Sequence, residues 1–522
     1  MANRKKNIEF NEEDDKESAS ERRARIIDVI ERSHTFLTLR NTEELLYFDP
    51  HDGQWHEGTT FLNEFVRKEA GSDYTTNLFR EIKAAVMVDT YIDPDKFKSP
   101  AEWINLKNGA LNVLKTEFIR RDPEPDFTKM EDEVRQLKAE MQKKLKGVKD
   151  TPGTEESDRV KESIRKDYNS RIGTNMAEIT KKEQEWRKTQ KEKFAKFYFT
   201  STLPVSFDPS ATCPRIDAFF RKLEIGDEMI LKIHELFGYC LYKSYPFKKM
   251  FIFEGPNDTG KGAVASLLEA LLGENNYSAL SLDAIQDDKY EKKKLKGMYA
   301  NISGELASKF IKDTSLIKEL LGSDSISVRE MYSQKNVKFR NHAKLIFLAN
   351  QIPATYDTDE AFYPKVEMFE FRKQFPEGSP DRIEHDDLMA ELATDQELSG
   401  LLNKVVKAFQ GLKKRGKFTA NRSAEKNKEI YLIRSNPFKY YFEEALEFGE
   451  GEKLIKSEAY ANFVFFCQQY NVPFISDSTF YTQLKHYLNE RGIVQKRDDG
   501  GKGQRYYPGV SVKKFWGGMD SS

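Results

Sequence analysis

A nucleotide site is suggested by GPNDTGKG, residues 255–262. An apolar run, Met250 to Phe253, precedes this segment, and apolar residues at helical spacing follow it. Backbone amides in a glycine-rich turn and at the start of a helix donate hydrogen bonds to phosphate, and a lysine supplies positive charge. The flanking runs favour this interpretation over a chance match in a surface turn. We therefore expect contacts to nucleotide from Gly255, Pro256, Asn257, Asp258, Thr259, Gly260, Lys261, Gly262 and Ala263.

The segment departs from the pattern G-x-x-x-x-G-K-[ST] at its last position, where Gly262 replaces a hydroxyl residue. That hydroxyl ordinarily ligates Mg²⁺. Ser266 lies about 6 Å further along the helix axis, so it cannot substitute. We expect ATP and Mg²⁺ as cofactors, with the metal held by water, phosphate oxygens and an acid from elsewhere in the chain.

Two polar residues follow apolar runs that read as strands. Glu305 comes shortly after Met298–Ile302, and Asn350 after Leu345–Leu348. A carboxylate at such a strand end can orient the attacking water and hold Mg²⁺ through its hydration shell, so Glu305 is the expected catalytic acid and metal ligand. An amide there can sense the terminal phosphate or position water, which is the role expected of Asn350. The alternative is that both are ordinary polar residues at strand ends.

Alternating apolar residues predict a β-hairpin over about 326–340, around the polar tip SQKN. Basic groups on a projecting hairpin suit phosphate contacts along nucleic acid. A solvated surface hairpin is the alternative. The residues expected to contact DNA here are Arg329, Lys335, Lys338 and Arg340.

Composition limits the class of protein. A length of 522 residues suggests three or four domains. Lys+Arg number 84 and Asp+Glu 85, so any nucleic-acid surface must come from local clustering of charge. Three dispersed cysteines form no metal-ligand spacing and favour a reducing cytoplasm, here the host cytosol. We find no signal-peptide core and no membrane-spanning run, so no membrane partner is expected.

The chain divides into seven segments by composition and periodicity. A charged, partly disordered N-terminus (1–35) precedes a small α+β domain (36–121). Residues 122–198 are dominated by Glu, Lys, Arg and Gln and predict a charged helical hairpin, for which solvated outer faces are favoured over a dedicated binding arm. The remaining segments are a helical collar (199–245), an α/β nucleotide-binding core (246–378), a helical lid or linker (379–435) and a winged-helix-like domain (436–522).

The last segment reads as two helices followed by two strands around a glycine turn, which is the order of a winged helix. Such domains bind DNA or other proteins, so both roles stay open. The basic residues expected to contact DNA are Lys485, Lys496, Arg497, Lys502 and Arg505.

The order of these motifs resembles the superfamily 3 helicases, the AAA+ branch found in viral, phage and plasmid replication proteins. The chain is most similar to the helicase half of phage, plasmid and poxvirus-type primase–helicases. The likeness covers about 200–375 well and 40–115 loosely. It is carried by INLKNGALNV, STLPVSFDPSATCP, FFRKL, HELFGYCLY and the run KELLGSDSISVREMYSQKNVKF to AKLIFLANQIP.

The resemblance implies a multidomain α/β fold: an AAA+ P-loop core with helical flanking regions, a long charged helical insertion and a C-terminal winged helix. It also implies a homohexameric ring that moves 3′ to 5′ on DNA. Lys261 resembles the phosphate-binding lysine, Glu305 the catalytic acid and Asn350 the sensor. The hairpin from Val328 to Arg340 resembles the hairpin that grips DNA in the central pore.

In this family a basic residue reaches the ATP of the neighbouring subunit, usually from an Arg-Arg pair after the sensor strand. This sequence has Pro364-Lys365 at that place. Lys365 keeps the charge but lacks the bidentate fork of arginine. Arg372 is the other candidate.

The expected function is that of an ATP hydrolase and DNA helicase acting on single-stranded and forked duplex DNA, in replication of a virus, phage, plasmid or integrated element. An ATP-binding replication initiator or assembly switch with little hydrolysis is the alternative, motivated by Gly262 and Lys365. A small-molecule kinase has no use for the basic hairpin, and a degenerate scaffold would use the fold only for oligomer contacts. The residues before the first compact segment lack a polymerase's acidic site, so a separate primase or polymerase is a possible partner.

Overall fold

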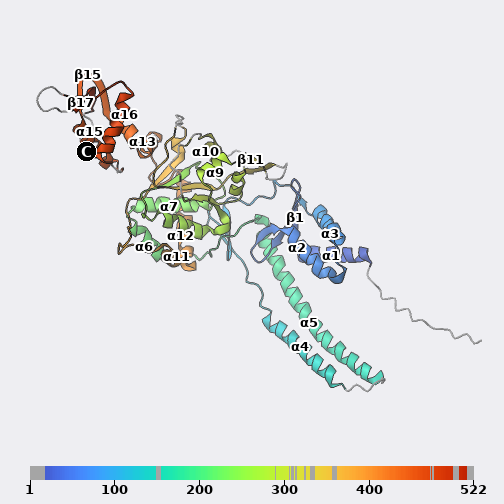
Figure 1. Ribbon diagram of the computed structural model, residues 1–522. Helices are drawn as coiled ribbons and strands as arrows, with labels where there is room; N and C mark the ends of the chain where they lie inside the picture. Colours follow the sequence, from blue (N-terminus) through green and yellow to red (C-terminus); the bar gives the residue numbers. More distant parts are fainter. Residues whose placement is uncertain are drawn as a thin grey trace, which may run out of the picture. The chain divides into compact units, whose positions relative to one another are not determined.

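The protein is described by a computed structural model (Figure 1). The described residues are 18–148, 155–288, 290–304, 306, 311, 314–322, 325–329, 336–355, 361–470, 472, 475–497 and 505–513. The chain divides into two compact units, Met1–Phe207 and Asp208–Ser522. The fold is multidomain α/β, with several separate sheets.

The first unit contains a four-stranded sheet in the order β3-β2-β1-β4, in which only the β1–β4 pair is parallel. Its elements are α1 (Ala19–Ser33), β1 (Phe36–Leu39), β2 (Glu44–Asp49), β3 (Gln54–Glu57), α2 (Gly58–Ala70), α3 (Thr76–Asp89) and β4 (Tyr91–Ile92). Helix α1 begins with a capping box, in which the side chains of Ser18 and Glu21 each accept from the other's backbone amide. Ile26 and Ile30 of α1 are buried in the same core as Val66 of α2, so α1 belongs to this domain.

A second sheet and a helical pair complete the first unit. The antiparallel sheet consists of β5 (Trp103–Leu106), β6 (Gly109–Asn112) and β7 (Phe118–Arg120). The helical pair consists of α4 (Thr128–Gly147) and α5 (Glu155–Phe194), which lie side by side (Figure 1). Residues 199–207, which sequence analysis assigned to the helical collar, belong to the first unit. Within this segment, Leu203 forms an isolated parallel β-bridge with Leu106 of β5.

The second unit contains a five-stranded parallel sheet in the order β14-β8-β13-β10-β9. Its strands are β8 (Met250–Glu254), β9 (Tyr277–Ser278), β10 (Ala300–Ser303), β13 (Lys344–Ala349) and β14 (Val366–Glu370). Strands β8, β10 and β13 are buried along their whole length, as expected when both faces of a parallel sheet are covered. Helix α8 (Lys261–Leu272) follows β8 after the glycine-rich loop and buries the periodic apolar residues that predict it.

Helices surround this sheet (Figure 1). They are α6 (Pro214–Lys222), α7 (Asp227–Cys240), α9 (Leu282–Asp287), α10 (Ser315–Leu320), α11 (His385–Leu392), α12 (Asp395–Arg415) and α13 (Ala424–Ser435). Helices α7 and α12 approach so closely that a Cβ at Gly238 would lie 2.1 Å from the carbonyl oxygen of Val405. None of the helices formed by the described residues has the length and apolar character needed to cross a lipid bilayer.

The hairpin expected from alternating residues consists of β11 (Ser325–Arg329) and β12 (Asn336–Arg340), which pair antiparallel. Ile326, Val328 and Phe339 are buried, whereas Lys338 and Arg340 are exposed. The pairing therefore places apolar residues on one face and basic residues on the other.

The C-terminal part of the second unit has a core of its own, rich in aromatic side chains. Its elements are α14 (Pro437–Ala445), β15 (Leu446–Ile455), α15 (Lys456–Gln469), α16 (Asp477–Asn489), β16 (Lys496–Arg497) and β17 (Arg505–Val512). The sheet order is β15-β17-β16, and both pairs are antiparallel. Sequence analysis anticipated α15, α16 and the last two strands, and β15 adds a third strand against β17.

Candidate nucleotide-binding site

The loop between β8 and α8 has a shape that requires its glycines. A Cβ at Gly255 would lie 2.1 Å from the carbonyl oxygen of Phe371, so only glycine fits beside that backbone. Gly260 has φ +80°, in the left-handed region that favours glycine. The amide of Phe375 donates to the carbonyl oxygen of Asp258 at 2.7 Å and holds the tip of the loop. The amides at the start of α8 are thereby brought to the carboxyl edge of the sheet, where α/β proteins bind ligands.

Lys261 is the first residue of α8, and its side chain is directed back over the loop. Its Nζ donates to the carbonyl oxygen of Pro256 at 2.7 Å and to Oδ1 of Asn350 at 2.8 Å. Burial lowers the pKa of Lys261, and the nearby carboxylates of Glu254 and Asp258 oppose this effect. Both hydrogen-bond partners are neutral, so the ammonium keeps its capacity to attract an anion.

Asn350 follows β13 at the same edge of the sheet, so the structure brings this expected sensor into contact with the expected phosphate-binding lysine. Gly304, one residue past the end of β10, lines the cavity beside them. Glu305 itself lies outside the described residues, so its role stays a prediction.

A cavity of about 570 Å³ opens next to Lys261. The loop and the ends of β10 and β13 form one side. The remaining lining comes from α6 and its end, from the segment before α11 and from α11 itself, and it includes both apolar residues (Phe219, Leu223, Phe375, Ile383 and Leu388) and charged ones (Lys222, Asp381, Arg382, Glu384 and His385). A cavity that is lined by a lysine, by loop amides and by several apolar side chains has the mixture of polar and apolar groups that is typical of small-molecule sites.

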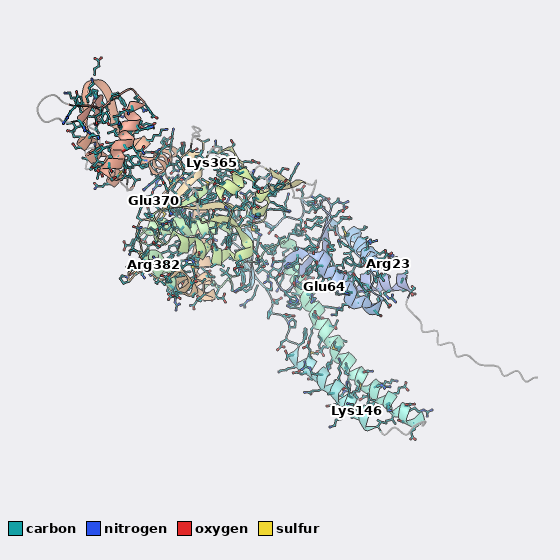
Figure 2. The ribbon with its side chains drawn as sticks, viewed as in Figure 1. Arg23, Glu64, Lys146, Lys365, Glu370 and Arg382 are labelled. Atoms are coloured by element: carbon teal, nitrogen blue, oxygen red, sulfur yellow. The ribbon has the colours of Figure 1, made fainter. Side chains whose placement is uncertain are left out.

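Arg382 also lines this cavity, and sequence analysis did not single it out (Figure 2). Its Nη1 lies 3.4 Å from Oδ1 of Asp258 and 3.4 Å from the carbonyl oxygen of Phe375, and its Nε lies 3.4 Å from Oε1 of Glu384. Contacts of this length are weak hydrogen bonds, so the guanidinium is held loosely beside the loop. A lone arginine in a polar loop carries no spacing signal, which is why the sequence does not reveal it.

Arg372 is held by two carboxylates of its own chain. Its Nη1 and Nη2 donate to the two oxygens of Glu254 at 3.1 and 2.6 Å, and Nη2 also donates to Glu370 at 3.2 Å. Glu370 further accepts from Arg422 and Arg434. Burial alone would raise the pKa of Glu370, but these three arginines bring it below the usual value. Arg372 therefore connects the end of β8, immediately before the phosphate loop, to the end of β14.

Lys365 lies at the opposite edge of the sheet from the loop. It ends the short turn Tyr363–Lys365 directly before β14, whereas Glu370 is the last residue of that strand (Figure 2). Strands β14 and β8 are parallel, with Val366 beside Met250. Of the two residues expected to reach a neighbouring subunit, Lys365 thus lies at the edge of the sheet opposite its own loop, and Arg372 is paired beside that loop.

The described residues of the site offer more donors for an anion than ligands for a metal ion. Lys261 and the loop amides can hold the phosphates. Near the loop, Thr259 Oγ1 donates to the carbonyl oxygen of Pro256 at 3.0 Å, and Glu254 is paired with Arg372. A Cβ at Gly262 would meet nothing within 4 Å, so space for a hydroxyl residue exists there. Glu305 stays the expected protein contact to Mg²⁺, through its hydration shell.

The residues expected to bind DNA lie in two regions of the second unit, the β11–β12 hairpin and the C-terminal domain. Lys338 and Arg340 project from the exposed face of β12, and Lys485, Lys496, Arg497 and Arg505 are exposed in the C-terminal domain. Arg497 lies directly opposite Arg505 in the β16–β17 pair. Lys335, Lys502 and the side chain of Arg329 lie outside the described residues.

Two segments of the chain match family models. Residues 253–362 match a family described as of unknown function (DUF5906), and residues 434–515 match a family described as Poxvirus D5 protein-like. The second match supports the poxvirus side of the resemblance and covers the aromatic-rich C-terminal domain. No curated protein sequence matches this chain.

Several solved structures are similar to the chain at low identity. One apo structure of the C-terminal region of NrS-1 is 13% identical, covers 59% of this chain and 77% of that chain, and has a TM-score of 0.30. Another is 11% identical, covers 93% and 98% of the two chains, and has a TM-score of 0.35. Both scores lie below 0.5.

Proposed function

We propose that the protein is a ring-forming, ATP-dependent DNA helicase with a superfamily 3 AAA+ core, acting 3′ to 5′ in replication of a virus, phage, plasmid or integrated element. The observation that carries this proposal is the contact between Lys261 and Asn350, which both line a cavity of about 570 Å³. The match to the poxvirus-type family adds support for a replication protein.

In this proposal Lys261 binds the terminal phosphates of ATP and Asn350 senses them. Bound Mg²⁺ would neutralise the charge that develops during phosphoryl transfer. Glu305 positions the attacking water, and Lys365 of one subunit approaches the site of the next. Arg372 acts within its own subunit, where its pairing with Glu254 fixes the strand end that carries the loop.

Movement on DNA is assigned to the β11–β12 hairpin. Lys338 and Arg340 lie two residues apart on one exposed face, a spacing that presents both to a phosphate backbone. The C-terminal domain has the element order of a winged helix, and its exposed basic residues provide a second contact to DNA.

The test is strand displacement from a forked duplex by purified full-length protein with Mg-ATP. Wild-type protein should separate the strands, and Lys261→Ala should abolish both ATP hydrolysis and unwinding. Lys407→Ala serves as the matched control, since Lys407 is an exposed lysine on α12 away from the cavity. Unwinding by Lys261→Ala at the wild-type rate would contradict the proposal.

A second candidate function is an ATP-binding assembly switch with little hydrolysis. It is favoured by Gly262, which offers no hydroxyl for the metal. DNA-stimulated phosphate release at several turnovers per second would exclude the switch, whereas ring formation on ATP binding without turnover would support it.

A further inference from the structure

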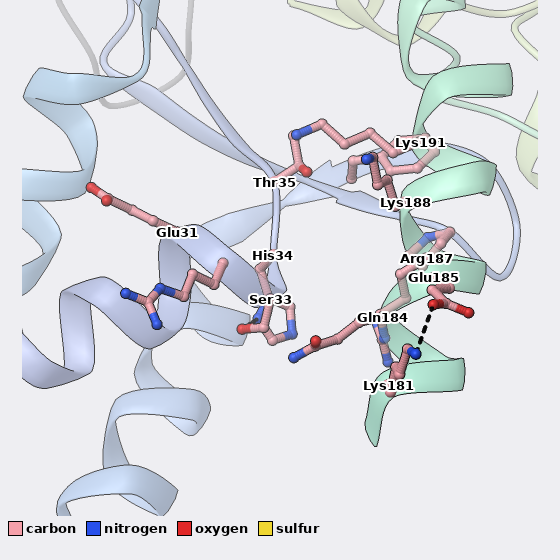
Figure 3. Close-up of a pocket in the computed structure, with 13 residues that line it drawn as sticks. Glu31, Ser33, His34, Thr35, Lys181, Gln184, Glu185, Arg187, Lys188 and Lys191 are labelled. Carbon is pink, nitrogen blue, oxygen red and sulfur yellow. Dashed lines mark hydrogen bonds and ion pairs between the residues drawn. The ribbon is translucent and has the colours of Figure 1, made fainter. Parts of the chain in front are cut away.

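A groove in the first unit lies between α5 and the segment that joins α1 to β1 (Figure 3). It encloses about 420 Å³. Figure 3 shows the labelled side chains of α5 on one side of this groove and Glu31, Ser33, His34 and Thr35 on the other. We call it the α5 groove.

The lining of the α5 groove is strongly positive. Its two acidic residues are Glu31 and Glu185, and its five basic residues are Arg32, Lys181, Arg187, Lys188 and Lys191. The lining therefore has a formal net charge of 5 − 2 = +3, although the whole chain has −1. Sequence analysis favoured solvated outer faces for this helical pair. Lys181, Lys188 and Lys191 are exposed to solvent and also line this groove.

The lysines of α5 follow a line along the groove. Lys181, Lys188 and Lys191 are seven and three residues apart, which places them on one helix face at intervals of about 10 and 5 Å. Lys181 has Glu185 within 4.0 Å. Lys188 and Lys191 form no hydrogen bond or ion pair with any residue that the structure describes, so both ammonium groups remain available to an anion.

Contacts within the protein hold the C-terminal end of α5, residues 186–193, in place without a ligand. Trp186 Nε1 donates to the carbonyl oxygen of Asp122 at 3.3 Å. The carboxylate of Asp122 accepts from Gln190 Nε2 at 2.9 Å and from Lys193 Nζ at 2.6 Å. These contacts lie on the buried side of the same two helical turns that present Lys188 and Lys191. A ligand therefore meets cations whose helix is already positioned, which lowers the entropic cost of binding.

An aromatic ring stands opposite the lysines. His34 lines the groove, and its ring packs against Phe61 and Phe65 with centroid distances of 5.0 and 4.8 Å. Burial, followed by the charge of Arg187, lowers the pKa of His34 to about 4, so the ring is neutral near pH 7. A supported neutral ring beside a row of cations is the combination by which proteins hold single-stranded nucleic acid.

We propose that the α5 groove binds a single strand of nucleic acid, with Lys181, Lys188 and Lys191 contacting successive phosphates and His34 contacting a base. A single strand is favoured over a duplex because His34 can stack only with a base that is unpaired and turned outward, whereas a duplex keeps its bases inside the stack. The proposal depends on the proposed function only for the identity of the polyanion as DNA. The proposal gives the charged helical insertion a contact to nucleic acid of its own, in addition to those proposed for the β11–β12 hairpin and the C-terminal domain.

The test compares Lys188→Ala/Lys191→Ala with the control Lys138→Ala/Lys166→Ala, which removes two exposed lysines of the same helical pair away from the groove. Binding of a fluorescent oligothymidylate of about 20 nucleotides to full-length protein is measured over a range of salt concentrations. Loss of two phosphate contacts should make the slope of log K against log salt shallower by about 1.4 and weaken binding about tenfold at low salt. The control should bind as the wild type does.

Four results separate the two proposals. An unchanged slope in the groove variant, with DNA binding by the wild type intact, overturns the α5 groove and leaves the helicase proposal standing. Equal losses in both variants attribute the effect to net charge and also overturn the groove. Absence of DNA binding by the wild type overturns both proposals. A shallower slope in the groove variant, with unchanged ATPase activity in the absence of DNA and an unchanged melting temperature, supports the groove.

Discussion

The pairing of Arg372 with Glu254 makes a prediction that distinguishes two roles for this arginine. Replacing Arg372 by Met keeps much of the side-chain length but removes the guanidinium. Glu254, which is 7% exposed, then loses both of its hydrogen bonds from Arg372. Hydrogen bonds to charged groups contribute about 1.5–3 kcal/mol each, and Arg372 is 26% exposed, which reduces their contribution. We expect the free energy of unfolding to fall by about 3 kcal/mol.

Thermal unfolding without nucleotide measures this loss. A change of 3 kcal/mol corresponds to a fall of about 6–12 °C in melting temperature for a domain of roughly 200 residues. Glu254→Gln and the double variant complete a double-mutant cycle, in which we expect a coupling energy of about 2 kcal/mol. Arg221→Met is the matched control because Arg221 is exposed on α6, and it should change stability by less than about 0.5 kcal/mol.

Mixing variant and wild-type subunits distinguishes a role of Arg372 within its own subunit from a role in hydrolysis at the neighbouring subunit's site. If Arg372 acts within its own subunit, the variant should bind nucleotide more weakly even as an isolated chain. The reasoning is refuted if Arg372→Met melts with the wild type, binds nucleotide normally and loses hydrolysis only as the neighbour of a wild-type subunit. That result would make Arg372 the residue that reaches across the interface.

Three further predictions concern other residues of the second unit. Gly262→Ser should keep the melting temperature of the wild type, because a Cβ there meets nothing within 4 Å. It should raise the ATPase rate at limiting Mg²⁺ several-fold, and an unchanged dependence of the rate on Mg²⁺ would argue against a missing metal ligand. Gly255→Ala should destabilise the unit by about 2–3 kcal/mol in denaturant titrations, because its Cβ would lie 2.1 Å from the Phe371 carbonyl oxygen, whereas the control Gly262→Ala should not. Burial, and then the charge of Lys404, lowers the pKa of His234 to about 4, so the unfolded chain binds a proton more readily than the folded chain does between pH 6.5 and pH 4. The free energy of unfolding should therefore fall by about 3 kcal/mol as the pH falls from 6.5 to 4. The His234→Phe variant should show a weaker dependence of stability on pH over this range.

Local patterns account for the parts of the fold that the sequence predicts. The apolar strand before Gly255 and the helical spacing after Lys261 specify the loop, and the period-two alternation around Ile326 and Phe339 specifies the hairpin. The contact between Lys261 and Asn350 follows from the rule that parallel strands end at one edge of a sheet.

The rest of the site depends on contacts between residues far apart in the sequence. Arg372 and Glu254 are 118 positions apart, and Arg382 and Asp258 are 124 apart. No periodicity connects such pairs, so neither the pairing of Arg372 nor the position of Arg382 could be inferred. The α5 groove is a further example. Which side chains of α5 line the groove depends on the hydrogen bond from Trp186 to the carbonyl oxygen of Asp122, which is 64 positions away in the sequence.

The neutral partners of Lys261 have a consequence for exchange at the site. A phosphate that approaches the ammonium displaces only a carbonyl and an amide oxygen, so no ion pair must be broken before the new one forms. A carboxylate at position 350 would form an ion pair with Lys261, and an incoming phosphate would then have to break that ion pair. In the proposed reaction, the same two oxygens can accept hydrogen bonds from the ammonium again when the product leaves, so neither binding nor release requires an ion pair within the protein to break.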